Sequence, residues 1–191
     1  MDSSAAQLWA WRHPLPQNVE GRCTGHTDVR VDPRRTRRLA RRIERVARAQ
    51  GLPKRIWTSP LQRCADVGRW LKRWGWVHRI DAQLIEMDFG AWEGGQWSAI
   101  PRAEIDAWAN DFEHYAAGGG ESVRVLVERV AAWQPGGIAL VVTHAGWMRA
   151  RRWNDMVRAA SGVAPVPAVT LLLSAQTFPA SPVYGELWHL G

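Results

Sequence analysis

The chain has 191 residues, of which 46% are hydrophobic, and its 25 Lys and Arg residues against 18 Asp and Glu residues give a net charge of +7. This length and apolar content suit one globular domain over residues 1–191. No apolar run is long enough to span a bilayer and the N-terminus lacks the pattern of a secretory signal, so we expect a cytoplasmic protein that does not enter membranes.

The N-terminal half alternates short apolar runs with segments of helical periodicity. Gly51 and Pro53 end the first helical segment, and Pro60 suits the first turn of the second. The predicted elements are a strand over residues 7–11, a helix over 34–50, a strand over 55–58, a helix over 60–74 and a strand over 76–80.

The C-terminal half continues the same alternation. Ser122, after a Gly-rich loop, is a candidate cap for the helix that follows it. The predicted elements are a helix over 103–117, a helix over 123–133, a fully apolar strand over 137–143, a helix from about Gly146, and final strands over 170–178 and 184–190. This alternation predicts an α/β three-layer sandwich, with a mostly parallel central sheet and helices on both of its faces.

The helix predicted over residues 34–50 carries many arginines. Leu39, Ile43 and Val46 recur at helical spacing, so we interpret the arginines as a solvated face. No nucleic-acid motif accompanies them, and we do not expect nucleic-acid binding. The two cysteines, Cys23 and Cys64, are interpreted as free packing residues of a reducing compartment.

Polar side chains follow three of the predicted strands. Arg12 and His13 end the first strand, Arg63 comes soon after the second, and His144 ends the long apolar strand. Active sites of such sheets lie at the carboxyl ends of the strands, so we expect these residues to gather at one edge. Guanidinium groups match phosphate oxygens, and a neutral imidazole among cations can attack phosphorus. The residues therefore predict a phosphoryl-transfer site, which also needs a general acid.

Five segments occur in an order that resembles the histidine phosphatase superfamily, also called the phosphoglycerate mutase-like family. They span about residues 8–150 and read "RHP…NVEGRCTGHTDV", "TSPLQRCADVGRWL", "LIEMDFGAWEG", "GGGES" and "VVTHAGWMRA". The resemblance implies a phosphohistidine mechanism without a metal or another cofactor. It implies these roles: His13 is the nucleophile, Arg12 and Arg63 bind phosphate, His144 stabilises the phosphoryl group, Glu86 is the general acid and base, and Asn18, Thr24 and Ser59 join the phosphate pocket.

The chain also departs from the family pattern. Pro14 stands where the family has Gly after the nucleophile, the loop before Asn18 is one residue shorter, and Ala145 replaces a Gly. Asp88 and Glu93 are interpreted as structural or rim residues rather than catalysts, and His26 as part of a loop or the pocket rim.

The substrate is predicted to be a small-molecule phosphate. The chain is shorter than cofactor-dependent phosphoglycerate mutases, which favours hydrolysis over transfer, and it looks most similar to α-ribazole phosphatases of cobalamin assembly. Trp92, Trp97 or Trp108 could then stack on the base of the substrate.

Other functions stay open at this point. A broad phosphatase and a mutase-like enzyme with another substrate are alternatives within the family. A phosphohistidine protein phosphatase is disfavoured by Glu86, and a non-catalytic basic binding protein by the intact set of Arg12, His13, Arg63 and His144. The oligomeric state is also open, with a homodimer as one expectation.

Overall fold

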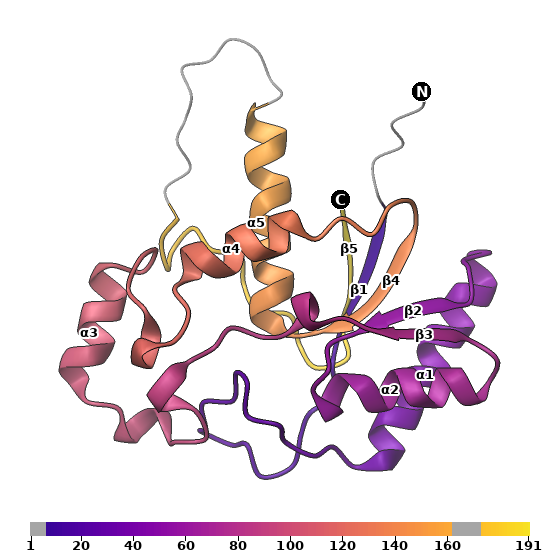
Figure 1. Cartoon of the computed structure of the whole chain (residues 1–191), viewed down its shortest axis with the longest axis horizontal. Helices are drawn as coiled ribbons and strands as arrows, with labels where there is room; N and C mark the ends of the chain where they lie inside the picture. Colours follow the sequence, from indigo (N-terminus) through magenta and orange to yellow (C-terminus); the bar gives the residue numbers. More distant parts are fainter. Residues whose placement is uncertain (1–6, 162–172) are drawn as a thin grey trace.

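The computed structural model describes residues 7–161 and 173–191. Its centre is a five-stranded sheet with the order β3-β2-β4-β1-β5 (Figure 1). The strands are β1 (Leu8–Arg12), β2 (Arg55–Thr58), β3 (Val77–Ile80), β4 (Ala139–Thr143) and β5 (Leu187–Leu190). Strands β1 to β4 run parallel to one another, and β5 pairs antiparallel with β1. The prediction of a mostly parallel sheet is therefore confirmed.

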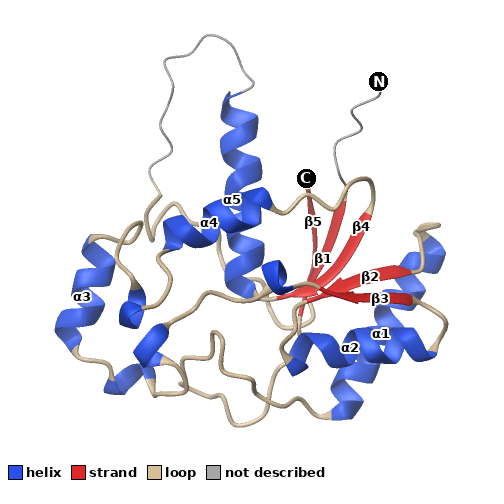
Figure 2. Cartoon of the chain, viewed as in Figure 1, coloured by secondary structure: helices blue, strands red, loops and turns tan. Residues whose placement is uncertain are grey.

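Helices cover both faces of this sheet, as the sequence predicts. Figure 2 shows α1 and α2 on one side of the strands, and α4 and α5 on the other. The helices are α1 (Pro33–Ala49), α2 (Gln62–Arg73), α3 (Arg102–Asn110), α4 (Val123–Ala132) and α5 (Ala145–Ser161). No helix within the described ranges is long and apolar enough to cross a membrane.

Side-chain alternation along the buried strands gives the protein two cores. In β1, Leu8 and Ala10 join the core under α4 and α5, whereas Trp9 and Trp11 join the core under α1 and α2. Strand β4 alternates in the same way and is buried along its whole length. A parallel strand covered on both faces accounts for the continuous apolar run in its sequence.

Two helix boundaries differ from the sequence predictions. Helix α2 begins at Gln62, so Pro60 precedes it instead of lying in its first turn. Helix α3 ends at Asn110 and not at residue 117, because Asp111 leaves helical dihedral angles and its carboxylate accepts the His114 N–H. Phe112 and Tyr115, beyond the end of α3, pack against the core under α4 and α5. The cap by Ser122 is confirmed, since its hydroxyl accepts the Val125 N–H.

The strand predicted over residues 170–178 is absent from its described part. Residues 170–172 lie outside the described residues, and residues 173–178 form a turn. The Phe178 N–H donates to the Ser174 carbonyl, and the Ser174 and Thr177 side chains bond across the turn. Residues 174–177, three of which are polar, lie between buried Leu173 and Phe178. Their side-chain hydrogen bonds favour a local turn over a strand.

The sheet register brings the two predicted histidines together. Arg12 lies beside Thr143 in the β1–β4 ladder, and the His13 N–H continues that ladder by donating to the Thr143 carbonyl at 3.0 Å. On the other side of β4, the Ser59 N–H donates to the Val142 carbonyl at 3.2 Å. Three strand ends therefore meet at one edge of the sheet, as the strand-end rule predicts.

Candidate active site

His13 is buried at the end of β1, with 5% of its surface exposed. Its Nδ1–H donates to the Pro14 carbonyl at 2.9 Å, which leaves Nε2 with a free lone pair. Burial, followed by the charges of Arg63 and Arg12, lowers the pKa of His13 well below its ordinary value. The ring is therefore a neutral imidazole in the tautomer that a nucleophile requires. The Pro14 carbonyl holds His13 in this tautomer. The backbone N–H that proline lacks takes no part in this contact.

His144 lies beside His13, with 5.1 Å between the two ring centroids. Arg63 Nε donates to His144 Nδ1 at 3.2 Å, so the proton is on Nε2, which donates to Ser59 Oγ at 2.8 Å. Burial and then the Arg63 charge lower the pKa of His144 well below its ordinary value. The structure thus brings Ser59 to the buried side of His144, where it orients the imidazole.

Arg63 joins three segments at the base of the site. Besides His144, its guanidinium donates to the carbonyls of Thr24, Gly25 and Thr27, at 3.2, 2.5 and 2.7 Å. All three of its nitrogens thus have protein partners. Its positive charge remains close to His13 and His144, and its predicted contact with phosphate stays a prediction.

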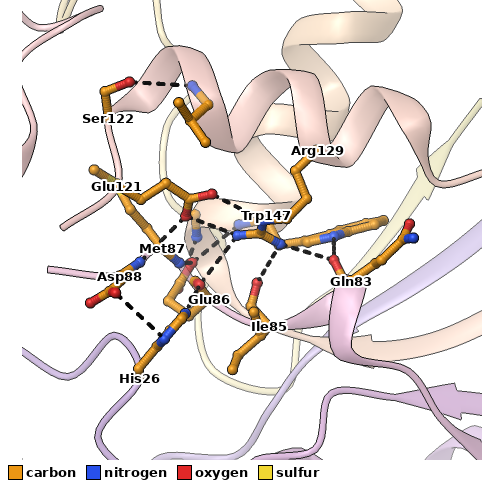
Figure 3. Close-up of polar contacts among 12 residues, drawn as sticks. His26, Gln83, Ile85, Glu86, Met87, Asp88, Glu121, Ser122, Arg129 and Trp147 are labelled. Atoms are coloured by element: carbon orange, nitrogen blue, oxygen red, sulfur yellow. Dashed lines mark hydrogen bonds and ion pairs between the residues drawn. The ribbon is translucent and has the colours of Figure 1, made fainter. Parts of the chain in front are cut away.

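Glu86 is held at the N-terminus of α5 (Figure 3). Its carboxylate accepts the N–H groups of Met87, Gly146 and Trp147 at 3.0 to 3.2 Å. Gly146 is required there, because a Cβ atom at this position would lie 2.3 Å from Glu86 Oε1. The carboxylate is therefore fixed by backbone donors in the first turn of a helix, where negative charge is favoured.

The segment around Glu86 is anchored by Arg129 from α4 (Figure 3). Arg129 donates to the carbonyls of Gln83, Ile85 and Glu86, and forms an ion pair with Glu121 at 2.9 Å. His26 Nε2 lies 2.9 Å from the Glu86 carbonyl. This network fixes the backbone of the acid segment without using the carboxylate of Glu86.

Asp88 and Glu93 serve structural roles, as expected. Asp88 accepts the Gly90 N–H, and Glu93 accepts the backbone N–H groups of His26, Thr27 and Phe89. Glu93 therefore ties the loop that carries Thr24 to the acid segment.

A cavity of about 370 Å³ opens next to Arg12 and Glu86, within the size range of small-molecule pockets. Thr24, Gly146, Arg22 and Arg149 also line it. Its remaining wall is largely aromatic and contains Phe89, Trp97, Trp108, Phe112, Phe178 and Tyr184. A phosphate ester with a bulky alcohol group matches a cavity lined by both cations and aromatic rings.

The predicted accessory residues do not all reach this cavity. Thr24 lines it, whereas Asn18 is exposed in a left-handed conformation with φ of 55° and has no contact with the residues above. Trp92 is buried and donates its indole N–H to Glu104, so it is not part of the wall. Trp97 and Trp108 do line the wall, with centroids 6.3 Å apart and ring planes 7° from parallel.

Sequence reasoning missed Arg22, Arg149 and Tyr184 on the cavity wall. Gly146 and Trp147 of α5 contact Glu86, and Arg149 lies about one helical turn after Gly146. The helix period therefore places Arg149 at the site once the contact between Glu86 and Gly146 is known. Tyr184 reaches the site only because the chain returns alongside β1, which local sequence does not reveal. In residues 7–161 and 173–191, no group of three His, Cys, Asp or Glu side chains could hold a metal ion.

Comparisons with known proteins agree with this geometry. The family model of the histidine phosphatase superfamily (branch 1) matches residues 8–157. Among curated proteins, no relative matches the chain.

Three solved structures illustrate the similarity. A mycobacterial glucosyl-3-phosphoglycerate phosphatase is 28% identical over 76% of this chain and 76% of that chain, with a TM-score of 0.60. A protein from Thermus thermophilus is 30% identical over 84% of this chain and 88% of that chain, with a TM-score of 0.60. The α-ribazole phosphatase from Shigella flexneri is 24% identical over 82% of this chain and 80% of that chain, with a TM-score of 0.64, and this likeness shows the fold alone.

Gly146→Ala should displace Glu86 while leaving the fold intact. The added Cβ meets the mobile end of the Glu86 side chain, which can rotate away, and no backbone atom. We expect kcat for a phosphate monoester to fall by roughly tenfold or more, since general acid–base catalysis contributes at least that much. Steady-state kinetics and thermal unfolding measure the two effects. Gly95→Ala, remote from Glu86, is the control, and an unchanged kcat in Gly146→Ala would contradict the assigned position of Glu86.

The free energy of unfolding should depend on pH through the two buried histidines. Because the pKa values of His13 and His144 are lowered in the folded protein, the unfolded chain binds more protons once the pH falls below about 6.5. This contribution is fully present above about pH 6.5 and is lost as the pH falls toward the lowered values. Urea unfolding at about pH 7.5 and about pH 5.5 measures the loss. His144→Gln should reduce it, the exposed His114→Gln should not, and equal losses in both variants would argue against the lowered pKa of His144.

Proposed function

The chain belongs to the histidine phosphatase superfamily, branch 1, and on that premise we propose that it hydrolyses phosphate monoesters of small molecules through a phosphohistidine at His13. The observation that carries the proposal is the neutral His13 ring. Its Nδ1–H is held by the Pro14 carbonyl, its Nε2 is unprotonated, and two guanidinium groups flank it. A neutral nucleophile surrounded by fixed cations is the arrangement that attack on an anionic phosphoryl group requires.

In the first half-reaction, His13 Nε2 attacks phosphorus and the bond from phosphorus to the ester oxygen breaks. The phosphoryl oxygens are drawn to Arg12 and Arg63, and His144 adds a buried imidazole beside the reacting group. Glu86, in its protonated form, donates its proton to the departing alkoxide, so the alcohol leaves neutral.

In the second half-reaction, the Glu86 carboxylate takes a proton from water, which attacks phospho-His13. The N–P bond breaks, inorganic phosphate leaves, and His13 returns to its neutral form while Glu86 is protonated for the next cycle. The backbone N–H groups of Gly146 and Trp147 hold the carboxylate in place for this step. No step requires a group that the chain itself does not supply.

For the alcohol portion of the substrate, we favour an aromatic group such as that of α-ribazole 5′-phosphate. Trp97 and Trp108 form a stacked pair on the cavity wall. A flat heteroaromatic base would stack on this pair. Such a substrate would assign the enzyme to cobalamin assembly. The two buried free thiols suit a reducing compartment such as the cytoplasm.

A second candidate is an ester whose alcohol portion carries its own negative charge. Arg22 and Arg149 line the same cavity. Among the described residues, the Arg149 guanidinium donates from Nε to the Pro179 carbonyl at 2.5 Å, and its Cζ lies 4.4 Å from the centroid of the Phe178 ring. Glycerate, part of the substrate named for the mycobacterial phosphatase, is an alcohol of this kind. Broad activity toward both kinds of ester is the intermediate case.

Phosphate release from a panel of monoesters, without added metal, tests the class of activity. The panel contains α-ribazole 5′-phosphate, 3-phosphoglycerate and p-nitrophenyl phosphate. We expect turnover by the wild type and loss of roughly a thousandfold or more in His13→Ala, since the nucleophile is removed. A folded His13→Ala variant with wild-type turnover would refute the proposed mechanism, and salt-dependent nucleic-acid binding without any turnover would favour a basic binding protein.

Two substitutions separate the candidate substrates. Trp108→Ala should raise KM for α-ribazole 5′-phosphate by roughly threefold to tenfold, because a stacking partner is lost. Arg149→Ala should instead raise KM for 3-phosphoglycerate, and Arg152→Ala, on the same helix but packed on Trp188, is the matched control. Neither cavity variant should change KM for methyl phosphate, which has no group to reach either residue. An equal rise in KM for all three esters would mean that the substitutions disturb the pocket as a whole.

A further inference from the structure

The segment before β5 binds Arg12 at three points. The Arg12 N–H donates to the Glu186 carbonyl at 3.0 Å, and the Gly185 N–H donates to the Arg12 carbonyl at 3.1 Å. The Arg12 side chain donates from Nη1 to the Pro182 carbonyl at 2.6 Å. Residues 182–186 therefore follow the end of β1 and fix the backbone and the guanidinium of one phosphate-binding candidate.

Tyr184 is the side chain of this segment that faces the site. Its ring centroid lies 3.8 Å from Arg12 Cζ and 5.5 Å from the centroid of the His13 ring. The ring is 40% exposed and lines the cavity. Its hydroxyl makes no hydrogen bond with the described residues. Neither core burial nor a hydroxyl contact explains this position, whereas the cation–π contact with Arg12 does.

The backbone on both sides of Tyr184 is held in place. Gly185 has a φ of 75°, which favours glycine, and its carbonyl accepts a hydrogen bond from Arg42 of α1 at 3.1 Å. The Val183 N–H donates to the Glu186 carboxylate at 2.6 Å, and the Trp188 indole donates to the other oxygen of that carboxylate at 3.0 Å. Tyr184 is therefore presented to Arg12 by a structured turn.

The contact with Tyr184 restricts the Arg12 guanidinium, which is the group expected to bind phosphate. Two sides of its guanidinium are occupied, one by the Tyr184 ring and one by the Pro182 carbonyl, and its Nε is buried without a partner among the described residues. A guanidinium fixed in this way loses little rotational freedom when it binds a phosphoryl group.

The Tyr184 ring also packs against the His13 ring. The charged and titratable groups that face His13 are Arg12 of β1, Arg63 of α2, His144 after β4, and Tyr184 of the turn. The two arginines disfavour a proton on His13 through their charge. The tyrosine ring packs against the imidazole, and 5% of the His13 surface is exposed.

We propose that Tyr184 is a positioning residue for phosphoryl transfer: it orients Arg12 toward the phosphoryl group and shields the His13 nucleophile from solvent. This inference rests on the proposed function and deepens it. The ring works through its face and its bulk, because its hydroxyl makes no hydrogen bond with the described part of the chain. Phenylalanine should therefore replace it, while smaller or non-aromatic residues should not.

Three substitutions separate these effects: Tyr184→Phe, Tyr184→Leu and Tyr184→Ala. Leucine keeps most of the cover over His13 but cannot stack on a cation, and alanine removes both. Val183→Ala is the matched control, since Val183 lies in the same turn with 68% of its surface exposed and keeps its backbone hydrogen bond on substitution. The measurements are the affinity for inorganic phosphate, by phosphorus NMR titration, and the pH dependence of kcat/KM for p-nitrophenyl phosphate.

We expect Tyr184→Phe and Val183→Ala to match the wild type in both measurements. Tyr184→Leu and Tyr184→Ala should bind phosphate roughly threefold to thirtyfold more weakly, the range for loss of one cation–π contact. In Tyr184→Ala, water reaches His13 and raises its pKa toward the ordinary value, so the acid limb of kcat/KM should move to higher pH. Unchanged phosphate affinity in Tyr184→Leu, or equal losses in Tyr184→Phe and Tyr184→Ala, would overturn the proposal.

The phosphate titration keeps this test distinct from that of the proposed function. If the wild type hydrolyses no ester, the proposed function fails, but the titration of wild type against Tyr184→Leu still decides whether the ring orients Arg12. If the wild type turns over and Tyr184→Leu binds phosphate equally well, the inference alone fails. Should Tyr184→Ala not fold by circular dichroism, Tyr184→Leu and Tyr184→Phe give the answer.

Discussion

Arg63 is a cation that is 1% exposed and forms no ion pair with any described carboxylate. A buried charge is stable only when its surroundings satisfy it, and here backbone carbonyls and one imidazole do so. Its contacts join α2, the loop that carries Thr24, and the end of β4. Burial and then the Arg63 charge lower the pKa of both His13 and His144, which keeps both rings neutral. Because carbonyls solvate this cation without neutralising it, the site keeps a positive potential for an anionic phosphoryl group.

Among the described residues, Glu86 supplies the one carboxylate on the cavity wall, opposite in charge to Arg12, Arg22 and Arg149. It stays there because the first turn of α5 offers it backbone donors, and because Gly146 leaves room for it. Nucleophile and acid thus come from different segments, since His13 follows β1 whereas Glu86 comes after β3 and is held by α5, with Arg129 anchoring the acid segment from α4. In the proposed reaction, side chains of these segments supply the nucleophile, the cations and the acid.

The sequence was sufficient to predict the layers of the fold and the meeting of His13 with His144, because both follow from hydrophobic periodicity and from where parallel strands end. Exact helix ends depend on local contacts such as that of Asp111 with His114, which periodicity does not encode. The orienting role of Ser59 and the carbonyl contacts of Arg63 depend on side-chain directions in three dimensions. Tyr184 lies far from β1 in sequence, and only the antiparallel return of the chain to β1 brings it to the site.

Rapid-quench trapping shows whether His13 becomes phosphorylated during turnover. Wild-type protein is mixed with p-nitrophenyl phosphate carrying labelled phosphate, quenched within one turnover under alkaline conditions that preserve phosphohistidine, and digested for mass spectrometry. We expect a phosphoryl group on His13 that forms as the first equivalent of alcohol is released. Because nitrophenolate leaves without a general acid, Glu86→Gln should slow the hydrolysis of phospho-His13 more than its formation, so that phospho-His13 accumulates further. Turnover with labelled phosphate on another residue, or with no labelled protein in either form, would show that His13 is not the nucleophile.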